Sequence, residues 1–192
     1  RARRDGDDYI LDGEKCLIPL VEQCQLFLVV AATDDGPAAF IVEADSPGLS
    51  RARQDYMGLR SAEPGTLTLE GVRVPASQRL ANFDLERLVS LSRIGLAALA
   101  TGCCQAVLEQ CVPYALERKA FGEAIARRQS VAFMIADMGI EIEGMRLLTW
   151  RAASRAEQGL PFQREAYLAF LQSMEKAMRI ATDGVQVFGG AG

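Results

Sequence analysis

Hydrophobic and polar residues follow two different patterns along the chain, and the change falls near residue 80. Up to about residue 78, apolar stretches of strand length are separated by Gly, Pro and Asp, which is typical of strands and turns. We expect strands at 9–11, 26–32, 38–42, 66–69 and 72–74. Turns are predicted at Asp12-Gly13 and at Glu70-Gly71, and the second of these indicates a hairpin between 66–69 and 72–74.

From Asn82 onward Ala, Leu, Glu, Arg and Met dominate, and apolar positions recur at three- and four-residue steps. This spacing predicts long amphipathic helices at 85–119, 130–158 and 163–187, with Pro113 as a potential kink in the first. The expected core positions on these helices are Leu88, Leu91, Ile94, Leu99, Val107, Leu108, Phe133, Met134, Ile140, Met145, Leu148, Tyr167, Leu171, Met174, Met178 and Ile180.

Long amphipathic helices with short connections bury their apolar stripes best against one another. We therefore predict an α+β multidomain fold, with an antiparallel β-barrel-like module at 1–78 and an up-down α-helical bundle at 82–192. A three-helix bundle of this length usually packs against a fourth helix. Both ends of the chain look cut, so we expect a fragment of a larger protein or a partly ordered one.

Composition narrows the function classes. The 192 residues are 49% apolar and 24% charged with a net charge of -4, and no basic stripe is present to bind nucleic acid. The longest nearly apolar run, 94–104, is about half of what a bilayer span requires, so no membrane span is expected. The charged N-terminus is not followed by the apolar segment of a signal peptide.

The chain has no histidine, which excludes Ser-His-Asp and Cys-His catalysis and removes the commonest zinc ligand, so no metal site is predicted. None of the five cysteines forms a C-x-x-C motif. They are expected to be free thiols that act as small buried apolar residues. The cysteines are Cys16, Cys24, Cys103, Cys104 and Cys111.

An aromatic residue stands where the helical pattern is interrupted. The break at Phe121-Gly122 needs only the glycine, and a small polar residue would suit a short turn better than Phe121 does. Arg118 precedes this turn and Gln129 follows it. Arg118 alone could simply complement the C-terminal dipole of a helix, so it is the combination of an Arg, an aromatic ring and a Gln that indicates a binding site.

The sequence resembles the acyl-CoA dehydrogenase family over essentially its whole length. Four stretches in the family's order carry this resemblance. They are Asp12-Gly13-Glu14-Lys15 with the apolar strand after it, Met57-Gly58-Leu59-Arg60-Ser61 with 67–75, Arg118-Lys119-Ala120-Phe121-Gly122 with Gln129, and 181–190, which ends in Gln186-Val187-Phe188-Gly189-Gly190. The resemblance implies FAD as cofactor and a dimer or tetramer. It also implies a helical domain before this chain and a fourth helix after it.

The resemblance assigns two groups of residues to the cofactor. Arg118 would grip the FAD pyrophosphate with its planar fork, Phe121 would pack on the adenosine end, and Gln129 would donate and accept through its amide. In the family these residues reach the FAD of the neighbouring subunit. Gln186, Gly189 and Gly190 match positions that approach the cofactor from the same side, although the two glycines would also serve as a helix C-cap.

The family's reaction removes an α-proton from an acyl-CoA thioester while a β-hydride passes to the flavin. Most members carry the catalytic glutamate in a segment that would lie beyond Gly192. A minority, similar to isovaleryl- and long-chain-type dehydrogenases, use a glutamate at the start of the long helix, which corresponds to Glu86 here. A glutamate in a first helical turn also complements the helix dipole, so both interpretations stay open.

Asp84 and Arg87 match positions beside the acyl-CoA path, although an exposed ion pair between them is equally consistent with the sequence. The implied partners are acyl-CoA as substrate, electron-transfer flavoprotein as electron acceptor, and further copies of the chain or a related subunit. The implied location is the cytoplasm, or the mitochondrial matrix in a eukaryote. A helical interaction module unrelated to flavins is the remaining interpretation.

One stretch departs from the family. Where its members read aromatic-Ile-Thr-Asn beside the isoalloxazine, this chain has Leu17-Ile18-Pro19-Leu20. Leucine cannot stack as an indole does, and Pro19 has neither a side-chain hydroxyl nor a backbone N–H. The loop before Asn82 is also short. These differences predict, as an alternative, a catalytically silent structural subunit of a hetero-oligomeric acyl-CoA dehydrogenase, which lends Arg118 and Gln129 to another chain's FAD.

Overall fold

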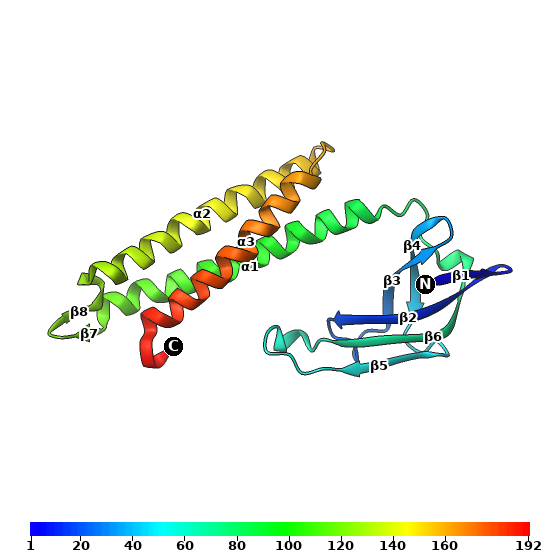
Figure 1. Ribbon diagram of the computed structural model, residues 1–192, viewed down its shortest axis with the longest axis horizontal. Helices are drawn as coiled ribbons and strands as arrows, with labels where there is room; N and C mark the ends of the chain where they lie inside the picture. The colour runs from blue at the N-terminus through cyan, green and yellow to red at the C-terminus, as the bar shows by residue number, and fades with distance from the viewer. The chain divides into compact units, whose positions relative to one another are not determined.

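The computed structural model describes residues 1–192, which divide into two compact units, Arg1–Leu85 and Glu86–Gly192. The first unit is built of strands and the second of three long helices (Figure 1). The predicted fold class is confirmed: antiparallel sheets are followed by a helical bundle. The sheets are open, so the expected barrel-like module is not a closed barrel.

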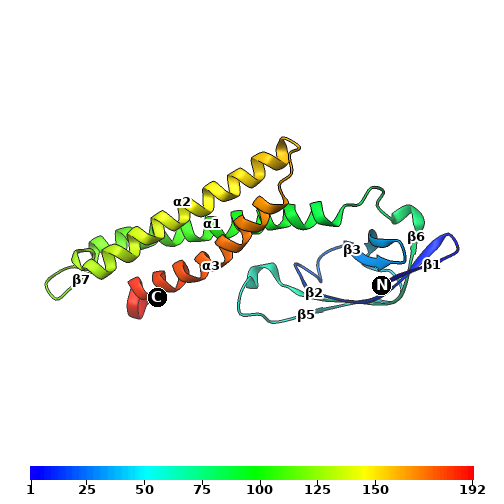
Figure 2. The same ribbon diagram turned by 45° about the horizontal axis from the view of Figure 1, so that its top comes forward.

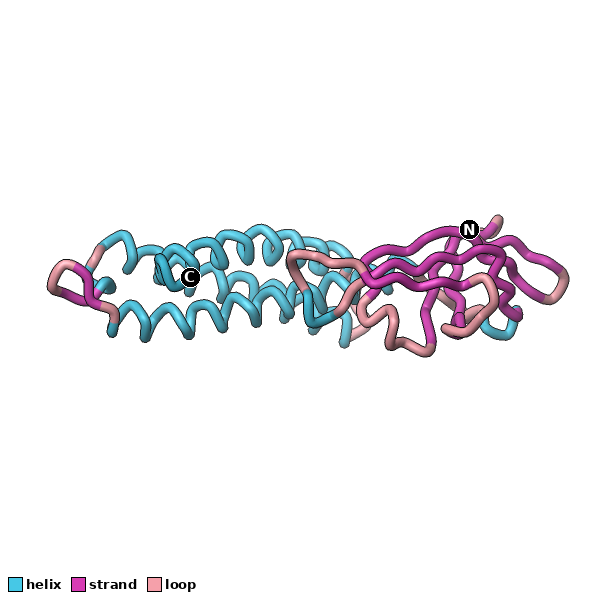
Figure 3. Tube along the Cα trace, turned by 90° about the horizontal axis from the view of Figure 1, so that it is seen from below, coloured by secondary structure: helices cyan, strands magenta, loops and turns pink.

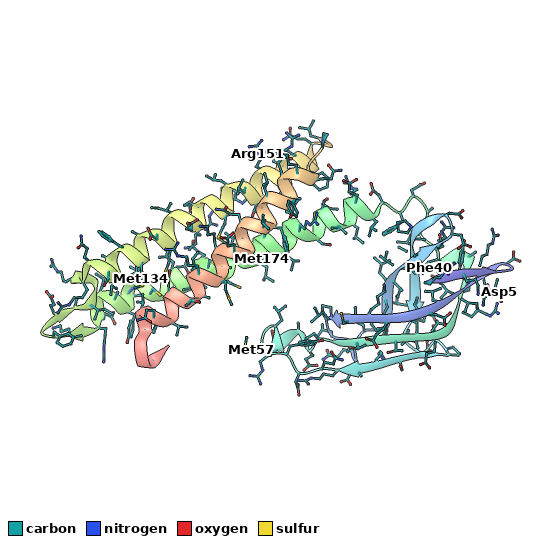
Figure 4. All side chains as sticks on the ribbon, in the orientation of Figure 1. Asp5, Phe40, Met57, Met134, Arg151 and Met174 are labelled. Carbon is teal, nitrogen blue, oxygen red and sulfur yellow. The ribbon has the colours of Figure 1, made fainter.

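All strand pairs of the first unit are antiparallel, and they form two sheets with strand orders β1-β2-β6-β5 and β3-β4. Their bounds are β1 Ala2–Asp5, β2 Asp8–Ile18, β3 Leu26–Thr33, β4 Gly36–Glu43, β5 Leu49–Arg53 and β6 Gly65–Pro75. Apolar side chains alternate along these strands, and those on the inner faces meet in one core that includes Leu11, Phe40 and Leu67 (Figure 4 labels Phe40).

The hairpin predicted at Glu70-Gly71 is wrong, and so is the turn at Asp12-Gly13, because β6 and β2 run straight through these positions. The two turn signals lie opposite each other. Leu11 pairs with Val72 and Gly13 with Leu69, so two residues of β6 oppose one residue of β2. This is a β-bulge, and the Asp12 carboxylate stabilises it by accepting the Gly71 N–H at 2.7 Å.

The three predicted helices are confirmed to within two residues at each end. They are α1 Leu85–Glu117, α2 Gln129–Glu157 and α3 Gln163–Phe188. Pro113 lies inside α1, which continues for another turn after it. Between α1 and α2 the chain forms a minute hairpin, β7 Lys119–Ala120 and β8 Glu123–Ala124, followed by the 3-10 turn η3 Ile125–Arg127. Figure 3 shows this hairpin as strand within the otherwise helical unit.

Small residues, rather than the large apolar ones, fill most of the space between the helices. The buried positions are Ser90, Ala97, Ala100, Thr101, Cys104, Cys111 and Ala115 on α1, Met138, Ile142, Met145, Thr149 and Ala152 on α2, and Glu165, Ala166, Ala169, Ser173, Ile180, Gly184 and Val187 on α3. At Gly184 an added Cβ would lie 2.5 Å from Val107 Cγ1, so α3 passes very close to α1 there.

Several core predictions for the helices are wrong. The exposed positions among them are Leu91, Leu99, Phe133, Ile140, Tyr167, Leu171, Met174 and Met178, and both Ile140 and Met178 are 71% exposed. The physical reason is that the helices are apolar on more than one face, so periodicity alone cannot tell which stripe packs within the unit. Met145 and Ile180 were predicted correctly and are buried.

By length and composition, α1 is also apolar enough to cross a membrane. The expectation of no membrane span rested on residues 94–104, which are only part of this 33-residue helix. Core helices of water-soluble proteins pass the same test, so the finding alone does not assign α1 to a membrane. Of the cysteines, Cys104 and Cys111 are buried as expected, whereas Cys16 and Cys103 are exposed.

Candidate cofactor and active site

The turn at Phe121 has a backbone conformation that disfavours its residue. Phe121 and Gly122 join β7 to β8 as a two-residue hairpin turn, and their φ angles of 54° and 89° are both positive. Glycine adopts such angles freely, but for a bulky L-residue the left-handed region is costly. The Phe121 side chain is nevertheless 96% exposed, so burial does not offset this cost within the unit. Strain held at an exposed aromatic residue favours a binding role.

Arg118 and Gln129 flank this hairpin. The Arg118 N–H donates to Tyr114 O at 2.8 Å, which extends the hydrogen bonding of α1, and Arg118 O accepts the Ile125 N–H at 2.9 Å, which closes the hairpin. Gln129 is the first residue of α2. Both side chains are exposed, as is Phe121. The three predicted residues therefore lie on one short, internally bonded segment with their side chains accessible.

The end of α3 is tied to the end of α1 through an aromatic pair. The Tyr114 ring stacks on the Phe188 ring at 4.3 Å between centroids, and the Tyr114 hydroxyl donates to Phe188 O at 3.2 Å. Gln186, Gly189 and Gly190 belong to this part of α3 and the 3-10 turn η4 Gly189–Ala191. Figure 2 shows the end of α3 on the same side of the helical unit as β7. The two predicted groups of cofactor residues thus occur at one end of the unit.

A groove between α1 and α3 opens beside this end. It has a volume of about 510 Å³, and Gln110 is its only lining residue with a polar side chain. The other residues that line it are Ala106, Val107, Ala181, Gly184, Val185, Phe188, Ala191 and Gly192. The groove shares Phe188 with the aromatic pair, so the predicted cofactor residues of α3 lie next to an apolar surface.

Glu86 lies at the opposite end of α1. It occupies the first turn of the helix and is exposed. Since α1 has 33 residues and a helix rises about 1.5 Å per residue, Glu86 and Arg118 are separated by on the order of 50 Å. One chain therefore does not bring the predicted base and the predicted cofactor residues together.

Asp84 and Arg87 flank Glu86 in sequence, and both are exposed. Asp84 precedes α1, while Arg87 lies in its first turn, where its guanidinium carbon is 5.7 Å from the centroid of the Phe162 ring. Arg87 thus contacts the segment that leads into α3, a contact the sequence analysis did not anticipate.

The loop that departs from the family has no side-chain hydrogen-bond donor. Leu17 and Leu20 have φ angles of 56° and 51°, so this segment is strained on both sides of Pro19. The Leu20 N–H, the backbone donor that directly follows Pro19, donates to Ala62 O at 2.7 Å. Leu17 and Leu20 are both exposed.

The comparisons with known proteins agree with this arrangement. The family described as "Acyl-CoA dehydrogenase, middle domain" matches residues 1–72, and "Acyl-CoA dehydrogenase, C-terminal domain" matches 84–192. The chain belongs to the acyl-CoA dehydrogenase family. It is 36% identical over 202 residues to short-chain specific acyl-CoA dehydrogenase, mitochondrial, of Bos taurus. This alignment covers 100% of this chain and 49% of the bovine protein.

Two solved structures match the fold closely. The ChsE4-ChsE5 complex from Mycobacterium tuberculosis gives a TM-score of 0.94 at 31% identity, over 99% of this chain and 52% of that chain. A glutaryl-CoA dehydrogenase from Mycobacterium smegmatis in complex with FADH2 gives a TM-score of 0.92 at 28% identity, and the match covers 100% of this chain and 51% of that chain. The chain therefore spans about half the length of the relatives that it matches.

Sequence reasoning missed two residues that organise the site. Tyr114 lies one helical turn before Arg118, and this spacing is a signal that could have placed its side chain near the same helix end. Arg128, directly before Gln129, contacts the Phe121 ring, and its guanidinium carbon is 5.6 Å from the ring centroid. The contact of Arg128 depends on how the chain turns back at β7–β8, and the contact of Tyr114 with Phe188 depends on where α3 returns to α1.

Proposed function

We propose that the full-length protein is an FAD-dependent acyl-CoA dehydrogenase that oxidises an acyl-CoA thioester to its α,β-unsaturated form. The observation that carries this proposal is the strained and exposed Phe121 between Arg118 and Gln129, at the end of the helical unit to which Tyr114 ties α3. The family membership supports it, because one relative of the same fold is a glutaryl-CoA dehydrogenase in complex with FADH2.

The chemistry of the donor set fits the adenosine and pyrophosphate end of FAD. Arg118 offers a planar cationic fork for phosphate oxygens, Phe121 an accessible ring for the adenine, and Gln129 an exposed amide. Gln186, Gly189 and Gly190 would complete the contacts from the end of α3. When bound, the flavin supplies the acceptor for the substrate's β-hydride.

A second protomer would complete the active site. Because Glu86 and Arg118 lie at opposite ends of α1, the Arg118 group of one chain would serve the flavin that faces Glu86 of another. This favours a homo-oligomer, a dimer or a tetramer. Electron-transfer flavoprotein is the proposed acceptor of the electrons, and the cytoplasm or the mitochondrial matrix the proposed location.

Glu86 is the proposed catalytic base, which takes the substrate's α-proton at its carboxylate, while Asp84 and Arg87 would contact the acyl-CoA on either side of it. Replacement of this base by an isosteric amide removes the proton acceptor and leaves the cofactor residues at the far end of α1 intact. Glu86→Gln in the full-length protein should therefore retain FAD and lose about 10²–10⁴-fold in the rate of flavin bleaching by acyl-CoA.

The matched control is Glu109→Gln, which changes an exposed glutamate of the same helix and should bleach as the wild type does. Full bleaching by Glu86→Gln would refute the role of Glu86 and move the base to another segment of the protein. A full-length protein that binds no FAD under any condition would refute the dehydrogenase itself.

A silent structural subunit is the second candidate, and the loop at Leu17–Leu20 favours it. This loop has no side-chain donor for the flavin ring, and Pro19 lacks a backbone N–H, whereas the adenosine-end residues are all present. One structural relative is a complex of two proteins, ChsE4 and ChsE5. The visible spectrum separates the candidates: a protein that is yellow when purified alone supports the enzyme, and one that gains flavin only with a related subunit supports the silent partner.

A further inference from the structure

Arg128 holds a place that links two of the proposed cofactor residues. Its backbone is fixed on both sides, because its N–H donates to Ile125 O at 2.9 Å and its carbonyl accepts the Ala132 N–H at 3.0 Å. It immediately precedes Gln129 at the start of α2. From this fixed point its side chain reaches back over the hairpin to Phe121.

Two contacts hold the Arg128 side chain against the hairpin. Its guanidinium carbon lies 5.6 Å from the centroid of the Phe121 ring, within the range of a cation–π interaction. Its Nη2 atom lies 3.3 Å from Glu123 Oε1, on the strand that follows the turn. Phe121, Arg128 and Glu123 therefore lie next to one another on the hairpin surface, with the guanidinium paired to the carboxylate and placed over one face of the ring.

The Phe121 ring needs such support because it has almost no other packing. It is 96% exposed, and an unpacked side chain samples several rotamers, which must be given up when a ligand binds. A guanidinium on one face restricts these rotamers in advance and leaves the other face open for a flat aromatic ligand. Preorganisation of this kind strengthens binding without any direct contact to the ligand.

We propose that Arg128 is a positioning residue, held by Glu123, that fixes the Phe121 ring for stacking on the adenine of FAD. The role rests on the proposed function, because it concerns the same cofactor site. It differs from that of Arg118, whose exposed fork is proposed to bind phosphate directly. Arg128 acts through Phe121, so its effect on FAD affinity should disappear when the ring is absent.

A double-mutant cycle on the full-length protein tests this coupling, with the FAD dissociation constant as readout. Arg128→Met keeps the length of the side chain and removes the guanidinium, and we expect FAD binding to weaken about three- to tenfold, the scale of an exposed cation–π contact and ion pair. Phe121→Ala alone should weaken binding, and Phe121→Ala/Arg128→Met should match it. Glu123→Gln should weaken binding in the same direction as Arg128→Met.

The matched control is Arg127→Met, which removes the neighbouring exposed arginine of η3 and should leave FAD affinity within twofold of the wild type. An Arg128→Met protein that binds FAD like the wild type overturns the positioning role. The role is also overturned if Arg128→Met weakens FAD binding as much in the Phe121→Ala background as in the wild type, because this would indicate a direct contact with the phosphates. In either case, a loss of FAD binding in Arg118→Met would still support the proposed function.

A second measurement does not require FAD. Trp150 is the one tryptophan of these 192 residues, so Phe121→Trp combined with Trp150→Phe, and with Phe in place of any tryptophan elsewhere in the full-length protein, places a single reporter at the turn. Its time-resolved fluorescence anisotropy should show faster local motion when Arg128→Met is added, and no change when Arg127→Met is added. Equal motion in all three proteins would overturn the proposal, even if the wild-type protein binds no flavin.

Discussion

Replacement of Phe121 by asparagine should stabilise the cofactor-free protein and weaken its hold on FAD. Phe121 has a φ of 54° and a ring that is 96% exposed. The left-handed conformation costs an ordinary L-residue about 1–2 kcal/mol, whereas asparagine adopts it more readily because its short side chain hydrogen-bonds locally. The native residue is therefore an unfavourable choice for the turn itself.

The free energy lost with the Phe121 side chain is smaller than the backbone strain that the substitution relieves. The substitution removes the contact with Arg128, and an exposed cation–π contact contributes about 0.5–1 kcal/mol. Almost no apolar area is lost, because the ring is exposed. With about 1 kcal/mol of strain relieved and about 0.5 kcal/mol of contact removed, Phe121→Asn should raise the free energy of unfolding by about 0.5 kcal/mol.

Urea unfolding of the full-length protein, stripped of flavin and followed by far-ultraviolet circular dichroism, measures this difference in the free energy of unfolding. Phe121→Ala is the matched control, since it loses the ring but keeps the backbone strain, and it should fall about 1 kcal/mol below Phe121→Asn. With saturating FAD the order should reverse in favour of the wild type, because a ligand stabilises only the state that binds it. Equal stability of the asparagine and alanine variants would refute the strain argument.

Two further changes probe the helical unit. Gly184→Ala would place a Cβ 2.5 Å from Val107 Cγ1 and should lower the free energy of unfolding by about 1–3 kcal/mol. The control Gly102→Ala, whose Cβ would meet no atom within 4 Å, should be neutral or stabilising. Equal urea midpoints of the two variants would contradict this prediction. Burial raises the pKa of the Cys111 thiol, and burial followed by the neighbouring Cys103 raises that of Cys104. Because the unfolded chain then loses these protons first, stability should fall as pH rises above about 8.5, and Cys111→Ala should reduce that slope in urea titrations.

Local sequence signals were sufficient for the three helices and for the residues of the candidate site, but they missed the strands β1 and β5. The three helices follow from apolar periodicity and from Gly159 and Gly189, which both have positive φ angles and end α2 and α3. The order of strands followed by helices was enough for the fold class. The Arg118, Phe121 and Gln129 pattern could be recognised because these residues lie within twelve positions of one another, in or next to one hairpin.

Long-range contacts decided the rest. Glu70-Gly71 and Asp12-Gly13 carry ordinary turn signals, and only their juxtaposition across β2 and β6, with the Asp12 carboxylate bonded to Gly71, makes them one bulge. Likewise, Ile140 and Met178 have the periodicity of core residues, but small residues elsewhere on the helices allow closer packing and leave both exposed. Tyr114 and Arg128 make their contacts with Phe188 and Phe121 only in the folded chain. A contact between segments depends on where the backbone carries each side chain, which local preferences do not encode.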